Sequence, residues 1–279
     1  MKALRSEYPL STLCRVLEVA RSSASYASRP SAPRELGELK SCILHLRVTY
    51  REFGVRRMFA LLRRLGMGVS RLDVREAYDQ LGILKKHPLR KVRTTNSDHA
   101  GPFFPNLVKG LEVKRPDQVW VTDVTYVRVG ARFGYLALLM DVYTRQIVGW
   151  ALESFLGLKL VLQALEMALS TGRHPEIHHS DRDAAYAAPD YAARFPAGKT
   201  RMSMTAADSP EDNGYAERLN RTVKEEEVYL GEYRNVDEAR EGIEPYIRYY
   251  NEQRIHSSLK YQTPSEVLRE WIDDQRRRT

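Results

Sequence analysis

Cysteine is scarce in this sequence. The 279 residues include only Cys14 and Cys42, and neither belongs to a paired ligand motif. This excludes a disulfide framework and a zinc knuckle. Long apolar runs are missing too: no stretch reaches the roughly 20 residues that span a bilayer, and the chain does not open with a secretory signal. We therefore expect a cytoplasmic protein with no membrane partner.

Acidic residues are outnumbered. The chain has 36 Asp and Glu against 44 Lys and Arg, a formal net charge of +8 and a pI near 9.4. The surplus is concentrated in residues 47–93, where thirteen basic residues face four acidic ones. Such a concentrated field favours a polyanionic partner, with nucleic acid as the first candidate. A basic surface that serves only solubility is the alternative.

The N-terminal part reads as two helical units. Residues 1–30 predict a short helix-turn-helix-like unit, with Ser11 as the cap of its first helix. Leu13, Val16 and Leu17 would form the apolar stripe of that helix. Glu18 stands in the turn, where glycine is commoner.

Residues 38–84 predict a helical DNA-binding domain. Apolar residues recur at helical spacing from Val55 to Leu62, and Gly66 is placed to end that helix. A second helix would start at Ser70 with Asp73 as a capping-box partner. The DNA-contacting candidates of this unit are basic residues on or beside these helices: Arg56, Arg57, Arg63, Arg64, Arg71 and Arg75. A solvated helix face is the plainer alternative.

Residues 85–112 lack periodicity and predict a basic linker. It either tracks a DNA backbone or acts as a plain tether. Its candidate phosphate contacts are all cations near its start: Lys85, Lys86, Arg90, Lys91 and Arg93.

From residue 113 the pattern changes to strands. Three alternating segments in meander order are followed by a helix over 158–170, a short strand, a helix, another short strand and a helix over 210–228. This order predicts an α/β fold with a ribonuclease-H-like mixed sheet over residues 113–230. Residues 231–279 predict a C-terminal helical extension, in which Gly242 and Pro245 should kink or shorten the first helix.

Polynucleotidyl transfer on such a core uses three carboxylates that hold two divalent cations. Asp123 lies among valines on one face of the first strand, where an uncompensated carboxylate is costly. Asp181 closes the strand "EIHHSD". Glu217 follows Asp181 by 36 positions, but three other Asp–Glu pairs share that step, so spacing alone decides nothing.

The surroundings favour Glu217. Asn213, Arg221 and Lys224 would share one helix face with Glu217, and we expect all three to contact DNA. On that face Glu217 would look toward the sheet, and Lys224 toward the phosphate of a DNA end. A helix ion pair is the alternative role for Lys224. Asp141, at a strand end beside a turn, is expected to be a structural hydrogen-bonding group. His178 and His179 alternate on their strand, so they do not suit one metal.

Four ordered motifs carry a family resemblance: "WVTDVTYV", "HSDRDAAY", "DNGYAERLNRTVKEE" and "YYNEQRIHSSLKYQTPSEV". With them the chain resembles the DDE transposase subunit of bacterial insertion sequences, a relative of retroviral integrases. The resemblance implies catalytic, metal-binding carboxylates at Asp123, Asp181 and Glu217 and a basic phosphate contact at Lys224. It also implies two Mg²⁺ ions per site, with Mn²⁺ as a substitute.

The same resemblance implies partners. These are double-stranded DNA at the element ends and in the target, further copies of the chain on DNA, and a fusion or partnership with an upstream helix-turn-helix protein. The protein would be associated with the nucleoid when bound to DNA. The chain departs from the family pattern at Asp183, at Ala185 and at Leu219-Asn220, where an aromatic pair is common, which leaves the local geometry open.

Three hypotheses follow. The first is a transposase that cleaves insertion-sequence ends and transfers the strands into target DNA. The second is a non-catalytic DNA-binding regulator, which the intact triad argues against. The third is a ribonuclease-H-fold nuclease without strand transfer.

Overall fold

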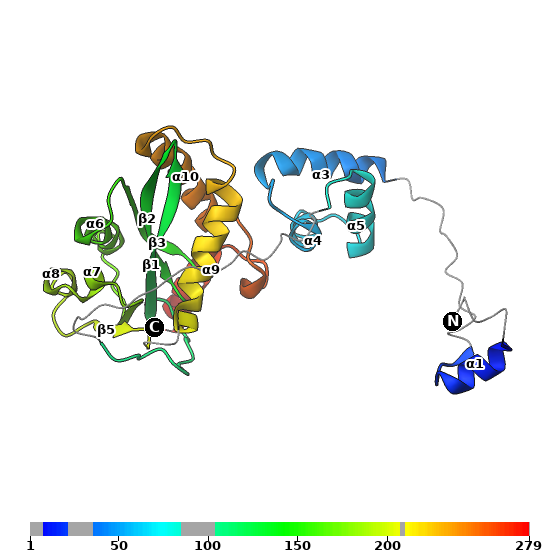
Figure 1. Cartoon of the computed structure of the whole chain (residues 1–279), viewed down its shortest axis with the longest axis horizontal. Helices are drawn as coiled ribbons and strands as arrows, with labels where there is room; N and C mark the ends of the chain where they lie inside the picture. The colour runs from blue at the N-terminus through cyan, green and yellow to red at the C-terminus, as the bar shows by residue number, and fades with distance from the viewer. Residues whose placement is uncertain (1–7, 22–35, 85–103, 207–209, 279) are drawn as a thin grey trace.

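The computed structural model describes residues 8–21, 36–84, 104–206 and 210–278. A mixed sheet in the order β3-β2-β1-β4-β5 forms the centre of the main body (Figure 1). The strands are β1 (Val119–Val129), β2 (Arg132–Asp141), β3 (Ile147–Glu153), β4 (Ile177–Ser180) and β5 (Arg201–Met204). The meander β1-β2-β3 is antiparallel, whereas β1 pairs with β4, and β4 with β5, in parallel. The predicted order of elements along the chain, a three-stranded meander followed by alternating helices and strands in a mixed sheet, is confirmed.

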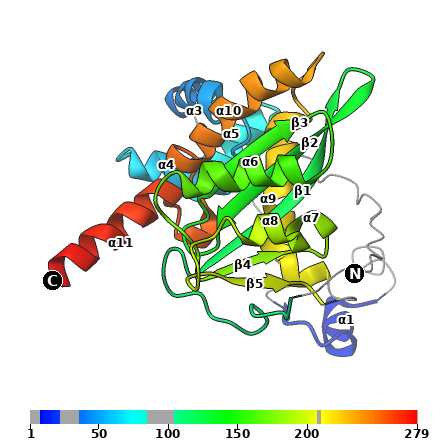
Figure 2. The ribbon, with the colours of Figure 1, turned by 90° about the vertical axis from the view of Figure 1, so that its left-hand side faces the viewer.

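Helices cover both faces of the sheet (Figure 2). One face carries α6 (Leu158–Leu169), α7 (Ala184–Ala187) and α8 (Pro189–Ala192). The other carries α9 (Gly214–Val223) and α10 (Val236–Glu252). Alternation along β1 explains the two layers: Val119 and Val121 face the α9–α10 layer, and Trp120 faces the α6 layer.

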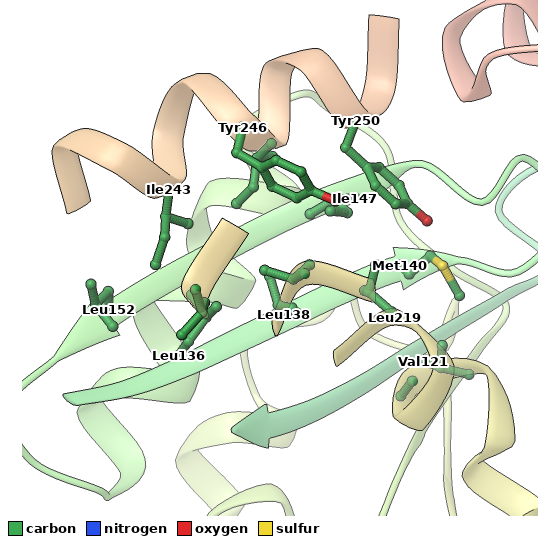
Figure 3. Packing of buried hydrophobic residues seen from close by; sticks show 14 of the residues in the cluster. Val121, Leu136, Leu138, Met140, Ile147, Leu152, Leu219, Ile243, Tyr246 and Tyr250 are labelled. Atoms are coloured by element: carbon green, nitrogen blue, oxygen red, sulfur yellow. The ribbon is translucent and has the colours of Figure 1, made fainter. Parts of the chain in front are cut away.

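The α9–α10 layer is tightly packed. Figure 3 shows Leu219 of α9 among Val121, Leu138 and Met140 of the sheet, with Tyr246 of α10 above them. On the other face, a Cβ at Gly149 of β3 would lie 2.2 Å from the carbonyl oxygen of Ala164. Only glycine therefore lets α6 approach β3 this closely. These contacts hold α9 in a fixed position over β1.

A second core lies in the N-terminal helices α3 (Gly37–Thr49), α4 (Val55–Arg64) and α5 (Arg71–Gln80). Their apolar stripes meet around Met58, Leu62 and Val74. The predicted capping box of Ser70 and Asp73 is present, and Gly66 and Gly82 adopt positive φ after α4 and α5. Both helices run as predicted, while α3 had no specific sequence prediction.

The first helical unit agrees only in part. Helix α1 (Leu10–Val16) begins after Pro9 without a side-chain cap, so Ser11 is not the cap. Leu13 is buried, but Val16 and Leu17 are exposed, so the predicted apolar stripe is wrong for these two. Glu18 adopts a φ of 52°. The predicted second helix falls largely on residues 22–35, outside the described part of the chain.

The C-terminal segment contains α10, a short 3-10 turn η4 (Ser257–Leu259) and α11 (Pro264–Arg278). Helix α10 continues through Pro245 to Glu252, so the prediction that it would be cut short is wrong, whereas a kink stays a prediction. Pro245 is exposed, which leaves the carbonyl freed by the missing N–H open to water. Gly242 is needed for room, because a Cβ there would lie 2.8 Å from the Tyr233 ring. In the described residues, no helix combines the length and apolarity of a membrane span.

Candidate catalytic site

Asp123 and Asp181 lie on neighbouring parallel strands. Val121 of β1 pairs with His179 of β4, and the two aspartates stand two residues further along each chain. Asp181 directly follows β4, at its carboxyl end. The same register that pairs the strands therefore brings the two carboxylates side by side.

Helix α9 brings a third carboxylate and an amide to this place. Ala216, Leu219 and Val223 bury one face of the helix against the sheet. On the same helix, Glu217 is exposed, and Asn220 is 7% exposed. The Asn220 amide donates a 2.8 Å hydrogen bond to Asp123 Oδ2. Since Glu217 and Asn220 are three residues apart, they stand one above the other on the helix surface.

The charges of the three acids interact. Burial and the negative charge of Asp181 raise the pKa of Asp123 from 3.8 to about 7, and Glu217 adds to this rise. Hydrogen bonds from the Val124 N–H and from Asn220 act in the opposite direction. The structure thus brings the predicted triad into mutual electrostatic reach. A cation is the group that such an arrangement of anions would favour.

The residues suit a divalent metal by their chemistry. All three acids offer hard oxygen ligands, and their repulsion is the energy that a bound cation would relieve. In the described ranges, however, no three or more His, Cys, Asp or Glu side chains are grouped closely enough to hold one ion.

The predicted helix over residues 210–228 is divided into three parts. A 3-10 turn η2 (Pro210–Asn213) precedes α9, and a π-helical segment η3 (Lys224–Val228) follows it. Asn213 is 3% exposed, and its amide donates to the Thr122 carbonyl of β1 at 3.1 Å. Its side chain is thus used inside the core, and a DNA contact by Asn213 stays a prediction. Arg221 is exposed and Lys224 is partly buried.

The π segment carries a buried glutamate. Glu226 is 7% exposed and accepts hydrogen bonds from Arg254 at 2.6 and 2.7 Å, from Arg57 at 3.2 Å and from the Tyr246 hydroxyl at 3.1 Å. Burial opposes its ionisation, but the two guanidinium groups prevail and hold the pKa of Glu226 below its usual value. The irregular turn aims this side chain inward. No helical periodicity in the sequence predicted it.

The predicted DNA-binding arginines separate into two groups. Arg57 is committed to Glu226, and Arg64 binds Glu266 and the Tyr261 carbonyl, so both fix the fold. Arg56, Arg63 and Arg71 line a basic hollow, whereas Arg75 is exposed elsewhere on α5. Five predicted contacts lie outside the described residues: Lys85, Lys86, Arg90, Lys91 and Arg93.

The other buried polar groups are structural. Asp141 accepts hydrogen bonds from the Thr144 N–H and hydroxyl and from the Asp117 N–H, in agreement with the expectation. His178 meets the Tyr191 hydroxyl at 3.0 Å, and His179 meets Ser203 Oγ at 2.8 Å. Burial lowers the pKa of His178 to about 3 and of His179 to about 4, so both rings are neutral.

Known proteins share this sequence pattern. One model of the integrase core domain matches residues 113–210, and a second matches residues 199–264. The transposase for insertion sequence element IS629 of Shigella sonnei is 30% identical over 275 residues, which cover 95% of this chain and 93% of that protein. The chain belongs to the insertion-sequence transposases. The IS600 uncharacterized 31 kDa protein of Shigella sonnei is 34% identical over 91% of this chain and 96% of its own length.

Two solved structures are also similar to this transposase. The HTLV-2 integrase catalytic core domain in complex with magnesium is 17% identical, with a TM-score of 0.44 over 55% of this chain and 97% of that one. The simian T-cell lymphotropic virus intasome is 15% identical, with a TM-score of 0.48 over 80% of this chain and 73% of that one. The family membership makes the chain a polynucleotidyl transferase of the integrase and transposase type.

Proposed function

We propose that this transposase cleaves DNA at the ends of an insertion sequence and joins the ends to target DNA, with Asp123, Asp181 and Glu217 as its catalytic carboxylates. The observation that carries the assignment is the electrostatic coupling of three acids from β1, β4 and α9. Mg²⁺ or Mn²⁺, two ions per site, would be held by these carboxylates and would activate the attacking hydroxyl and stabilise the leaving oxygen.

The protein's own groups prepare the site. The Val124 N–H binds Asp123 Oδ1 at 2.9 Å, and Asn220 binds Oδ2, so both oxygens are fixed and the carboxylate does not rotate freely. Arg221 and Lys224 follow Glu217 on the chain and would bind the phosphate at a DNA end. The docked face of α9 holds the helix from which Glu217 would reach the metal and the substrate.

The partners follow from the same activity. They are double-stranded DNA at the element ends and in the target, and further copies of the transposase on the paired ends. A fusion or partnership with an upstream helix-turn-helix protein and association with the nucleoid belong to this proposal. The division into residues 1–30, 38–84, 85–112, 113–230 and 231–279 remains a prediction.

The test uses element ends recovered from the DNA that flanks the gene. Wild-type protein with Mg²⁺ should join labelled, pre-cleaved ends to a plasmid. Asp123→Asn, Asp181→Asn and Glu217→Gln should each reduce joining by at least about 10³-fold, as losses of major catalytic electrostatic groups do. Asp190→Asn, which changes an exposed acid on α8, is the matched control and should join normally. Joining by Asp123→Asn at the wild-type rate would refute the assignment.

The same assay addresses the alternatives. Cleavage without any joined product would favour a nuclease of this fold. DNA binding without cleavage or joining, in every metal tested, would favour a non-catalytic regulator.

A further inference from the structure

A basic hollow of about 380 Å³ lies between the N-terminal helices and the C-terminal segment. Its lining comes from three places: α4, the start of α5 and the turn after η4. The lining residues are Arg56, Phe59, Ala60, Arg63, Arg64, Arg71, Lys260 and Tyr261. Figure 2 shows α4 beside the start of α11, where these parts of the chain meet.

Most of the charge in the hollow is available to a ligand. Arg64 is paired with Glu266 and holds the turn in place through the Tyr261 carbonyl at 2.7 Å. Arg56, Arg63, Arg71 and Lys260 are exposed, and within the described ranges no acid forms an ion pair with them. Four cations around one cavity repel one another, and an anion would relieve that repulsion.

The turn that presents Lys260 is held rigidly. Lys260 and Tyr261 both adopt left-handed conformations, with φ of 53° and 63°. Two successive residues of this kind without glycine are strained, and such strain persists only where the surroundings enforce it. Here hydrogen bonds do so: Tyr261 N–H donates to the His256 carbonyl at 2.8 Å, and His256 N–H donates to the Gln262 carbonyl at 2.9 Å. The backbone that carries Lys260 is therefore fixed at the edge of the hollow before any ligand arrives.

The apolar part of the hollow forms its floor. Phe59 and Tyr261 are partly buried against the core of α3–α5, so their rings are occupied by packing. The charged side chains are exposed around them. This pattern suits a sugar–phosphate backbone, whose phosphates meet the cations while the sugars cover the apolar floor. A stacked base would need a free aromatic face.

We propose that Lys260, together with Arg56, Arg63 and Arg71, forms one binding site for the sugar–phosphate backbone of DNA. The contribution of Lys260 is new, since its segment showed no DNA-binding signal in the sequence. The inference rests on the proposed function, because that function makes DNA the polyanion that the hollow would bind. It adds that the C-terminal segment contacts DNA together with the N-terminal helices. This segment continues from α10, which packs on the catalytic sheet.

The test measures the binding of a fluorescein-labelled, random-sequence DNA duplex to the full chain by anisotropy, over a range of salt concentrations. Each lost phosphate contact should reduce the slope of log K against log[salt] by about 0.9. Lys260→Gln and Arg63→Gln should each do so, with a loss of affinity of about five- to tenfold near 0.1 M salt. The double variant should lose about twice the slope of either single variant.

The controls separate this site from a diffuse basic surface. Lys159→Gln removes an exposed cation from α6, on the sheet face opposite α9, and should keep the wild-type slope. All variants should keep the wild-type Tm. A wild-type slope for Lys260→Gln would overturn the proposal. That result is expected if the hollow binds an acidic protein segment instead of DNA. An equal loss from Lys159→Gln would overturn it too.

The proposed catalytic function is tested separately in the same preparations. If Lys260→Gln reduces the slope, and Asp123→Asn keeps the wild-type slope but fails to join element ends, both proposals hold. If the wild type joins no ends while Lys260→Gln reduces the slope, the catalytic proposal fails and the binding site stands.

Discussion

Asn220 is the residue that most clearly distinguishes this site from the family pattern noted in the sequence. An aromatic residue is common at this position, but here a buried amide donates to Asp123 Oδ2. The departure was visible in the sequence, and its consequence was not. Asn220 lies about one helical turn after Glu217, so in the structure both side chains stand on the side of α9 nearest Asp123.

We expect Asn220→Leu to make Asp123 harder to ionise. A hydrogen bond to a charged group contributes about 1.5 kcal/mol, which corresponds to about one pKa unit. The acidic limb of the pH–rate profile for end joining should move to higher pH by up to about one unit, so that joining at pH 7 is slower. Thr222→Val, which removes a hydroxyl that bonds only within α9, is the control. A slower reaction with an unchanged profile would mean that Asn220 only packs.

The raised pKa of Asp123 also predicts pH-dependent stability. Its folded pKa of about 7 lies above the ordinary value of 3.8, so the folded chain binds the proton more tightly. The resulting destabilisation is absent below about pH 4, grows as the pH rises, and is complete above about pH 7. Asp123→Asn should therefore unfold at a higher Tm than wild type at pH 8.

At pH 8 we expect the free energy of unfolding of Asp123→Asn to exceed that of wild type by on the order of 1–2 kcal/mol, a value reduced by solvent screening at this partly exposed group. At pH 4 the two free energies should be almost equal. Thermal denaturation at both pH values measures it. Mg²⁺ at pH 8 should stabilise the wild type and have little effect on the variant. Equal stabilisation of both by Mg²⁺ would place the ion elsewhere.

Among the elements, the π-helical segment after α9 carries a buried ion pair between Glu226 and Arg254. Removing one partner of such a pair leaves an uncompensated charge, which typically costs about 3–5 kcal/mol. Glu226→Gln leaves Arg254, itself 9% exposed, in that position. Urea unfolding should show a loss near the lower end of that range.

The matched control is one residue away. Glu225→Gln changes an exposed acid of the same segment and should alter stability by less than about 0.5 kcal/mol. Equal effects from the two substitutions would show that the buried network adds nothing to stability.

The elements also show what sequence patterns can and cannot predict. Capping signals and helical periodicity predicted α4 and α5, because those signals act within one turn of helix. Alternation placed Asp123 correctly on the face of the valines. The π segment and the unbroken α10 were missed, since the first depends on Arg57 and Arg254, far away in the sequence, and the second on exposure of Pro245.

The same distinction holds for the candidate site. Its aspartates follow from strand ends and from parallel pairing, which the element order predicts. The roles of Arg57, Arg64 and Asn213 depend on tertiary partners more than 90 residues away. A cation on a helix face looks the same in the sequence whether it meets a carboxylate of its own chain or a phosphate.

At the scale of the whole molecule, the N-terminal helices and the catalytic sheet are joined by the C-terminal segment. Arg51 pairs with Glu227, Arg57 with Glu226, and the Tyr249 hydroxyl donates to Glu52. Ile255, just after α10, completes the core of α3–α5. The helices that would contact DNA are thus packed on a segment that continues from the catalytic sheet.

This arrangement predicts that Ile255→Ala loosens the N-terminal helices although the change lies about 200 residues from them in the sequence. Ile255 is 2% exposed, and truncating a buried isoleucine typically costs about 2–5 kcal/mol. Hydrogen exchange should show faster amide exchange in α4 and α5 than in wild type. Ile272→Ala, on an exposed face of α11, is the control and should leave that exchange unchanged. If protection were lost only in α10, the core of α3–α5 would be independent of the C-terminal segment, and DNA bound there would not be held in a fixed relation to the catalytic carboxylates.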